Sequence, residues 1–215
     1  MDKLKLKGKI IICTILLIIN MIPLSAQKTG IKTNVLYLAT TTLNTGLDFK
    51  FSEHWSGSIM AGYNPWLFSG GNTKLSTGEV TSANRKALHI LVMPEVRWWP
   101  HKTFERHSFG LHTIYSTYNI SGLPYPKALQ NSRYRGNLYG LGISWGYQWS
   151  IGKRWGIECA IGAGYLWTCY NKYEAGACGE PQGKGHHGFI APTKLALNIV
   201  SVSYTHLTLP TKRIV

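Results

Sequence analysis

The fold of this chain is decided by one alternating stretch. Residues 139–149 read Tyr139-Gly140-Leu141-Gly142-Ile143-Ser144-Trp145-Gly146-Tyr147-Gln148-Trp149. Every odd-numbered residue in this stretch is aromatic or aliphatic, and every even-numbered residue is Gly, Ser or Gln. Because successive side chains of a β-strand point to opposite faces, the stretch predicts a strand with one apolar face and one face of small or polar residues.

The same alternation recurs along the chain and predicts eight strands. They cover residues 33–40, 45–51, 55–63, 87–98, 107–119, 136–149, 155–170 and 188–200. The connections between them alternate between short and long, except that the first, residues 41–44, is short where a long one is expected. In an up-and-down barrel alternate connections lie at opposite rims. We therefore predict an all-β fold, an eight-stranded antiparallel up-and-down transmembrane β-barrel with short periplasmic turns and long extracellular loops.

The two ends of the chain are expected to lie outside this barrel. Four lysines at positions 3, 5, 7 and 9 precede apolar residues 10–24 and the small pair Ser25-Ala26, which is typical of a cleavable signal peptide over residues 1–26 and of Sec-dependent export. Residues 202–211, Val-Ser-Tyr-Thr-His-Leu-Thr-Leu-Pro-Thr, resemble a translated sequencing-library adapter. We expect residues 201–215 to be a non-native tail, which leaves residues 27–200 as the outer-membrane barrel.

The basic charge of the chain does not indicate a nucleic-acid-binding protein. The formal net charge is +14, but four of the lysines lie in the expected signal peptide, and the remaining basic residues are scattered. The sequence has no basic helix or basic-aromatic stripe of the kind that follows a phosphate backbone. Nucleic acid is therefore excluded as an expected partner.

The length of the chain predicts a single domain, since 215 residues are enough for one domain.

The alternation alone leaves open whether the apolar face points to lipid or to a soluble core. A lipocalin-like periplasmic binding barrel, also eight-stranded, is the alternative. Two features favour lipid. The second face is mostly Gly, Ala, Ser and Thr, which suits the narrow interior of a small barrel, and aromatic residues gather near the strand ends. The predicted interface girdle consists of Trp98, Tyr139, Trp149, Trp155 and Trp167.

A set of ionisable residues falls on the face that is predicted to line the barrel interior. It comprises Asp48, Lys50, Glu95, Arg97, His112, Glu158 and Lys194. Charges enclosed in a narrow lumen must be paired to be tolerated, so we expect a cross-strand network that plugs the barrel and leaves no wide pore. Pro94 lacks a backbone donor and predicts a bulge or a local edge in its strand.

One group of residues raises the question of catalysis. His112 and Ser116 share one face of a strand, and Glu95 or Glu158 across the lumen would complete a Ser/His/acid set of a lipid-modifying enzyme. Nucleophilic catalysis requires the three groups within hydrogen-bond reach of one another, which the sequence does not show. We therefore predict no catalytic residues and keep the enzyme as an alternative.

The cysteines and histidines near residue 180 raise the question of a metal site. Cys178, His186 and His187 lie close in sequence, but their spacing matches no standard zinc pattern. A disulfide between Cys169 and Cys178 is open in an oxidising compartment. The sequence thus predicts no metal and no cofactor.

Several motifs are distinctive. They are Lys32-Thr33-Asn34, Leu-Tyr-Leu-Ala-Thr-Thr at 36–41, Ala-Gly-Tyr-Asn-Pro-Trp at 61–66, Pro-Glu-Val-Arg-Trp-Trp-Pro at 94–100, Leu-Tyr-Gly at 138–140, Gly-Tyr-Gln-Trp at 146–149 and Ala-Pro-Thr-Lys at 191–194. Together they resemble a family described only as a domain of unknown function, whose members look like small outer-membrane β-barrels of Gram-negative gut-type anaerobes. The resemblance covers residues 27–200 and implies an envelope role beside fimbrial components. Members often carry a second cysteine just before Cys178, where this chain has Ala175, so their loop disulfide is not implied here.

These observations lead to one expected function and two alternatives. We expect a small integral outer-membrane barrel without enzymatic activity, with a structural, adhesion or surface-assembly role carried by the long segments 64–86, 120–135 and 171–187. Its expected partners are outer-membrane lipid and cell-surface or fimbrial components. The lipid-modifying enzyme and the soluble periplasmic binder remain the alternatives.

Overall fold

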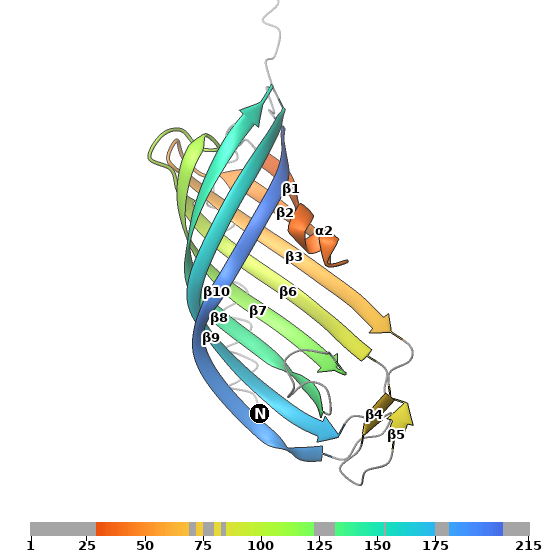
Figure 1. The fold of residues 1–215 in the computed structure, drawn as a ribbon. Coiled ribbons are helices and arrows are strands. Elements are labelled where there is room, and N and C mark those ends of the chain that lie inside the picture. The colour runs from red at the N-terminus through yellow and green to blue at the C-terminus, as the bar shows by residue number, and fades with distance from the viewer. Residues whose placement is uncertain are drawn as a thin grey trace, which may run out of the picture.

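The chain forms one ring of eight antiparallel strands, as the alternation predicts (Figure 1). A computed structural model describes residues 29–68, 72–74, 80–82, 85–122, 132–152, 154–174 and 181–203. The ring consists of β1 (Thr29–Asn34), β2 (Leu43–Lys50), β3 (Trp55–Phe68), β6 (Arg85–Trp98), β7 (Arg106–Ser121), β8 (Ser132–Ile151), β9 (Trp155–Glu174) and β10 (Pro181–Ser203). Each strand pairs with its neighbours in chain order, and β1 closes the barrel by pairing with both β2 and β10.

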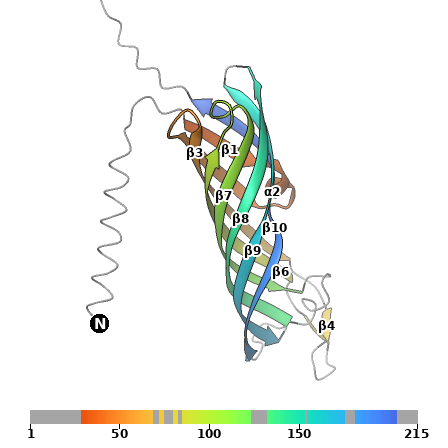
Figure 2. The same cartoon turned by 90° about the vertical axis from the view of Figure 1, so that its left-hand side faces the viewer.

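Two short strands lie outside the ring, between β3 and β6. They are β4 (Asn72–Lys74) and β5 (Val80–Ser82), which pair with each other (Figure 1; β4 is also labelled in Figure 2). Within the described ranges no helix is long and apolar enough to cross a membrane.

Seven of the eight predicted strands are found, and most are longer than the alternation indicated. β8 runs from Ser132 to Ile151 and β10 from Pro181 to Ser203. Residues 201–203, assigned to the expected tail, continue β10, while residues 204–215 lie outside the described residues, as do residues 1–28. The predicted strands are too short because the alternation is lost toward the ends of the observed strands. In β7, for example, residues 117–120 are all partly buried.

The predicted first strand, residues 33–40, is wrong. β1 ends at Asn34, and residues Val35–Ala39 form the short helix α2. The Asn34 side chain caps this helix by accepting a hydrogen bond from Leu36 N at 3.1 Å, and the same oxygen accepts one from Leu197 N of β10 at 3.2 Å. The apolar run that follows Asn34 looks like a strand in sequence, but the asparagine side chain takes over the bonding to β10 that a longer strand would make.

Of the two features predicted at Pro94, the bulge is wrong and the local edge is found. The register of β6 against β3 and β7 is the same before and after Pro94, although the pairing with β7 omits residues 93 and 94. A register shift occurs instead in β10, between Pro192 and Lys194. Both prolines lack a backbone donor, but only the one in β10 coincides with a shift.

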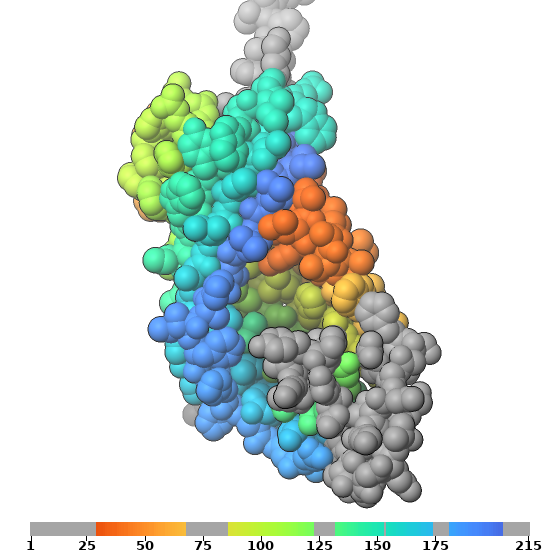
Figure 3. Space-filling model, viewed as in Figure 1, coloured from red at the N-terminus to blue at the C-terminus, as the bar shows by residue number. Residues whose placement is uncertain are grey.

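The early end of β1 leaves a lateral gap in the barrel wall, which we call the seam. β1 pairs with β10 only over residues 198–203 of β10, and β2 pairs with β3 only as far as Tyr63. Residues 181–194 of β10 and 64–68 of β3 therefore flank the seam. The helix α2 lies at the end of the seam where β1 stops (Figure 1). Figure 3 shows wall strands of the opposite side, yellow to green, between β10 in blue and the β1–α2 segment in orange.

The other end of the barrel is closed by a cluster that we call the plug. Trp99, Phe104, Val200 and Val202 pack together there, and Trp99 is fully buried. The indole nitrogen of Trp99 donates a hydrogen bond to Ser56 Oγ at 2.8 Å, which satisfies the one polar atom of that side chain. The plug end lies at the short connections, and the loop end lies opposite, at the long ones.

Candidate functional site

The barrel interior holds a group of six buried charged side chains, which we call the lumen charge cluster. It comprises Lys32, Asp48, Glu95, Arg97, Glu158 and Lys194, three cations and three anions from five strands. The closest contacts join Lys194 Nζ to Glu95 Oε2 at 2.7 Å, Arg97 Nη2 to Asp48 Oδ2 at 2.8 Å, Lys32 Nζ to Asp48 Oδ1 at 3.0 Å and Arg97 Nη1 to Glu158 Oε2 at 3.0 Å. The cluster is formally neutral and spans the lumen.

Arg97 is the centre of this cluster. Its guanidinium contacts both Asp48 and Glu158, and Nε lies 3.9 Å from Glu95 Oε2. A planar fork of donors suits arginine to bridge two carboxylates on different strands. Glu95 also has an uncharged partner, because Ser144 Oγ donates a hydrogen bond to Glu95 Oε1 at 2.6 Å. The expected cross-strand network therefore forms within the described part of the barrel.

The cluster differs from the sequence prediction in two lysines: Lys32 belongs to it, and Lys50 does not. Lys32 belongs to the cluster but was not predicted, because it precedes the predicted strand 33–40 and so had no assigned face. Lys50 was predicted there and lies on the inward register of β2, yet it is only half-buried near the plug end, and no ion pair joins it to another described residue. The correct start of β1 would have placed Lys32 two residues before Asn34 on the same face.

Glycine on the inward face provides the room that these charged side chains need. A Cβ atom on Gly110 would lie 2.5 Å from Ser144 Oγ and 2.6 Å from Glu95 Oε1. On Gly46 it would lie 2.8 Å from Lys32 Cγ. These distances are too short for real contacts, so the small residues of this face are a packing requirement of the cluster.

The Ser/His/acid set is not assembled. His112 Nε2 lies 2.8 Å from Thr193 Oγ1, and no described group bonds to its Nδ1. Ser116 is buried four residues further along the same strand, about 13 Å away at the usual rise per residue. The structure therefore brings His112 to the charge cluster and to Thr193, and leaves Ser116 out of hydrogen-bond reach of it.

An apolar layer follows the cluster toward the loop end. It contains Met60, Leu91, Met93, Ile114 and Leu166, with Tyr37, Leu138 and Ala191 packed against it. The lumen thus has three successive zones, the plug, the charge cluster and the apolar layer. Among the described residues, the side chains of the first two zones are almost entirely buried.

The outer surface carries many large apolar side chains. The girdle residues Trp98, Tyr139, Trp149, Trp155 and Trp167 are all exposed on the outward register. Between them lie further exposed apolar residues, among them Ile143, whose side chain is 70% exposed. We call this ring the outer belt. Trp155, Trp149 and Trp98 lie near the plug end, and Tyr139 and Trp167 lie toward the loop end, where Trp167 stacks on His186 at 5.6 Å between ring centroids.

The residues considered for metal binding do not come together in the described part of the chain. No group of three His, Cys, Asp or Glu side chains there could hold a metal ion. His187 stacks on Phe189, and Cys169 Sγ accepts a hydrogen bond from the Trp167 indole. Cys159 and Cys169 are free thiols, while Cys178 lies outside the described residues, as does Ala175.

Comparison with known proteins identifies the family and no activity. No curated protein matches the sequence. One family profile, described as "Protein of unknown function (DUF3575)", matches residues 10–202 and so covers the whole described barrel except its last residue, Ser203. The resemblance seen in the sequence motifs is thus confirmed at the level of the family. The chain belongs to the family of proteins of unknown function called DUF3575.

Proposed function

We propose that this protein is a small integral barrel of a bacterial outer membrane, without enzymatic activity, which acts as a structural, adhesion or surface-assembly element. One observation carries the proposal: the barrel is inside out. Its six most buried charges face the lumen, while every strand of the ring also carries large apolar residues that are exposed on the outer surface. A water-soluble barrel would place these two sets the other way round.

The height of the outer belt supports a bilayer as its surroundings. On β9 the belt runs from Trp155 to Trp167, and on β8 from Tyr139 to Trp149. At the usual strand rise and a tilt near 45°, these lengths correspond to roughly 23 to 28 Å along the barrel axis. That height matches the apolar band of about 25 Å, bordered by aromatic rings, that outer-membrane barrels present to lipid.

The strands that continue past the belt support a surface role. β8 begins at Ser132, seven residues before Tyr139, and β9 continues to Glu174. These extensions carry the long connections, and loops held on a rigid scaffold are where recognition most often occurs. Because the plug and the charge cluster close the lumen, transport of solutes is not part of the proposal. Ser116 lies out of reach of His112, so the geometry gives no support to the enzyme alternative.

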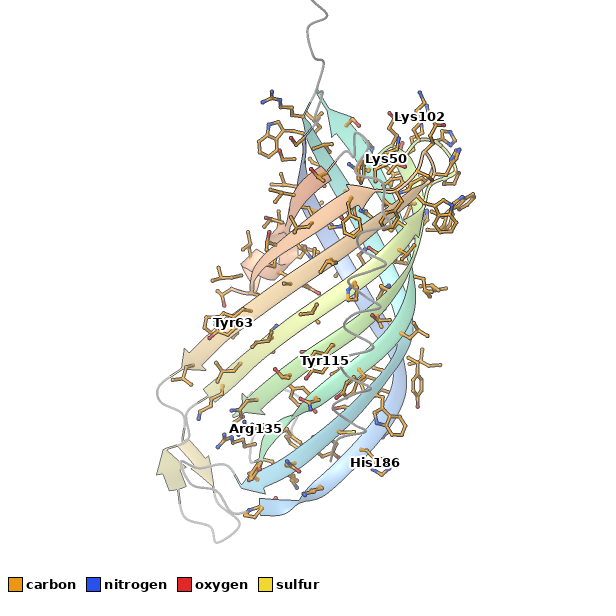
Figure 4. The ribbon with its side chains drawn as sticks, turned by 180° about the vertical axis from the view of Figure 1, so that it is seen from behind. Lys50, Tyr63, Lys102, Tyr115, Arg135 and His186 are labelled. Carbon is orange, nitrogen blue, oxygen red and sulfur yellow. The ribbon has the colours of Figure 1, made fainter. Side chains whose placement is uncertain are left out.

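Labelling of single cysteines on intact cells tests this proposal. In a background with Cys159, Cys169 and Cys178 replaced by Ser, Arg135→Cys and Lys102→Cys place a thiol at exposed positions at the two ends of the barrel (Figure 4). With a maleimide that does not cross membranes, we expect Arg135→Cys to react on intact cells and Lys102→Cys only after the outer membrane is permeabilised. Equal protection of both thiols in intact cells would contradict the proposal and favour a periplasmic barrel.

A further inference from the structure

The seam is the longest interruption of strand pairing in the described barrel wall, and it borders the apolar layer of the lumen, against which Tyr37 and Ala191 pack. We propose that the seam is a lateral entry through which an acyl chain of an anionic phospholipid in the outer leaflet reaches this layer. The inference rests on the proposed function, because only an inserted barrel has lipid beside it.

The seam is a built feature of the fold, held by three asparagines. Asn34 is 1% exposed and donates from Nδ2 to Leu195 O of β10 at 3.1 Å. Asn44 Nδ2 donates to Asn34 O at 3.0 Å, and Asn44 Oδ1 accepts from Asn34 N at 2.7 Å. Asn64 of β3 donates to Thr42 Oγ1 at 3.0 Å. These bonds fix β1, α2 and β2 at the end of the seam where β1 stops and satisfy the backbone where the sheet divides.

The seam opens at the height of the outer belt. On β10, Ile190 is 81% exposed beside it, and on β3 the outward side chains Tyr63 and Leu67 are exposed as well. α2 presents Leu36 and Leu38 to the same outer surface. An opening with this border faces lipid tails and not water, if the belt lies in a bilayer.

Inside the seam, the apolar layer is incomplete on the β10 side. Phe189 is paired in register with the buried Leu166 and lies on the inward face, yet 37% of its surface is exposed. Tyr37 of α2 and Ala191 of β10 border the layer at the same place, and two of its members are methionines, whose flexible side chains adapt to variable apolar shapes. An acyl chain would bury the exposed part of Phe189 against this layer.

The edges of the seam disfavour a protein strand as the occupant. An added strand needs a run of backbone donors and acceptors in regular register. Pro65 on β3 and Pro192 on β10 each remove a donor, and the register shift between Pro192 and Lys194 distorts the β10 edge. Such prolines and bulges are the features that protect sheet edges from strand addition.

The charges above the belt indicate the headgroup. The charged side chains described on the strand extensions at the loop end are Lys86, Arg133, Arg135, Lys172 and Lys184, all of them basic. Lys184 lies on β10, a few residues from Ile190 toward the loop end. A basic rim above an apolar entry is complementary to a lipid with an anionic phosphate headgroup and apolar tails.

Photo-crosslinking in vesicles tests the inference. The full chain is inserted into vesicles that contain phosphatidylglycerol with a diazirine near the end of one acyl chain, and the crosslinked residues are mapped by mass spectrometry. We expect crosslinks to outward residues such as Ile143 and, in addition, to the lumen residues Met60, Met93 and Phe189. Labelling of the lumen residues should be at least threefold weaker with the phosphatidylcholine analogue, because the basic rim prefers the anionic headgroup.

Two variants make the result specific. Ala191→Trp fills the border of the apolar layer and should reduce lumen labelling at least fivefold, while Ala163→Trp on the outward face of β9 should leave it unchanged. Crosslinks to Ile143 without crosslinks to the wild-type lumen residues would overturn the lateral entry and leave the proposed function intact. Absence of both sets would contradict the proposed function itself. Equal lumen labelling by the two lipids would overturn the anionic preference.

Discussion

Replacing Arg97 with methionine is expected to destabilise the barrel by about 3 to 5 kcal/mol, the usual loss when one partner of a buried ion pair is removed. Arg97 bridges Asp48 and Glu158, which are both almost fully buried. Without the guanidinium, Lys32 alone would face two carboxylates that have no access to water. The midpoint of urea unfolding of the protein in detergent micelles, followed by tryptophan fluorescence, measures the change.

Two further variants separate charge from packing in this experiment. Lys50→Met removes a lysine on the inward register of β2 that makes no ion pair with another described residue, so its effect should stay within about 0.5 kcal/mol. Arg97→Lys keeps one positive charge but loses the fork, and we expect an intermediate loss. If Arg97→Met unfolded at the same urea concentration as the wild type, the cluster would not be the closed network described here.

Replacing Ile143 with arginine is expected to destabilise the folded barrel in a bilayer by about 2 to 4 kcal/mol, the range measured for a basic residue on the lipid face at mid-depth. Ile143 points outward near the middle of the belt segment on β8 and contributes little to the lumen. Its replacement therefore tests what surrounds the barrel and leaves the interior unchanged. Folding into vesicles at increasing urea concentration, read by heat-modifiable gel mobility, gives the difference.

Asn137→Arg is the matched control for this substitution. Asn137 lies on the same strand and the same outward register, two residues beyond Tyr139 toward the loop end. A basic residue near the interface costs only about 0 to 1 kcal/mol, so this variant should fold almost as well as the wild type. Equal and small effects at both positions would indicate that water surrounds the belt.

The strands could be predicted from sequence because the physics that forms them is local. Alternation in residues 139–149 depends on the two faces of one strand and needs no knowledge of its neighbours. The helix α2 could not be predicted in this way, because its start depends on Asn34 bonding to Leu195 and Leu197 on the opposite end of the chain. The seam follows from the same long-range contact and was therefore also missed.

The lumen charge cluster was predicted in most of its members for a related reason. Asp48, Glu95, Arg97, Glu158 and Lys194 lie within clear alternating runs, so their inward direction followed from their neighbours. Lys32 lies next to the misassigned first strand. The position of Lys50 near the end of β2 could not be distinguished from that of Asp48, because alternation reports the direction of a side chain and not its depth.

The outer-membrane barrel itself is tested most directly by fractionation. The full chain is expressed in a Gram-negative host, the envelope is washed with alkaline carbonate, and the fractions are run on gels with and without boiling. We predict that the protein stays in the outer-membrane pellet, requires detergent for release, and migrates faster in the unboiled sample because the folded barrel resists the gel detergent. Recovery in the soluble periplasmic fraction without detergent, with the same mobility before and after boiling, would contradict this account.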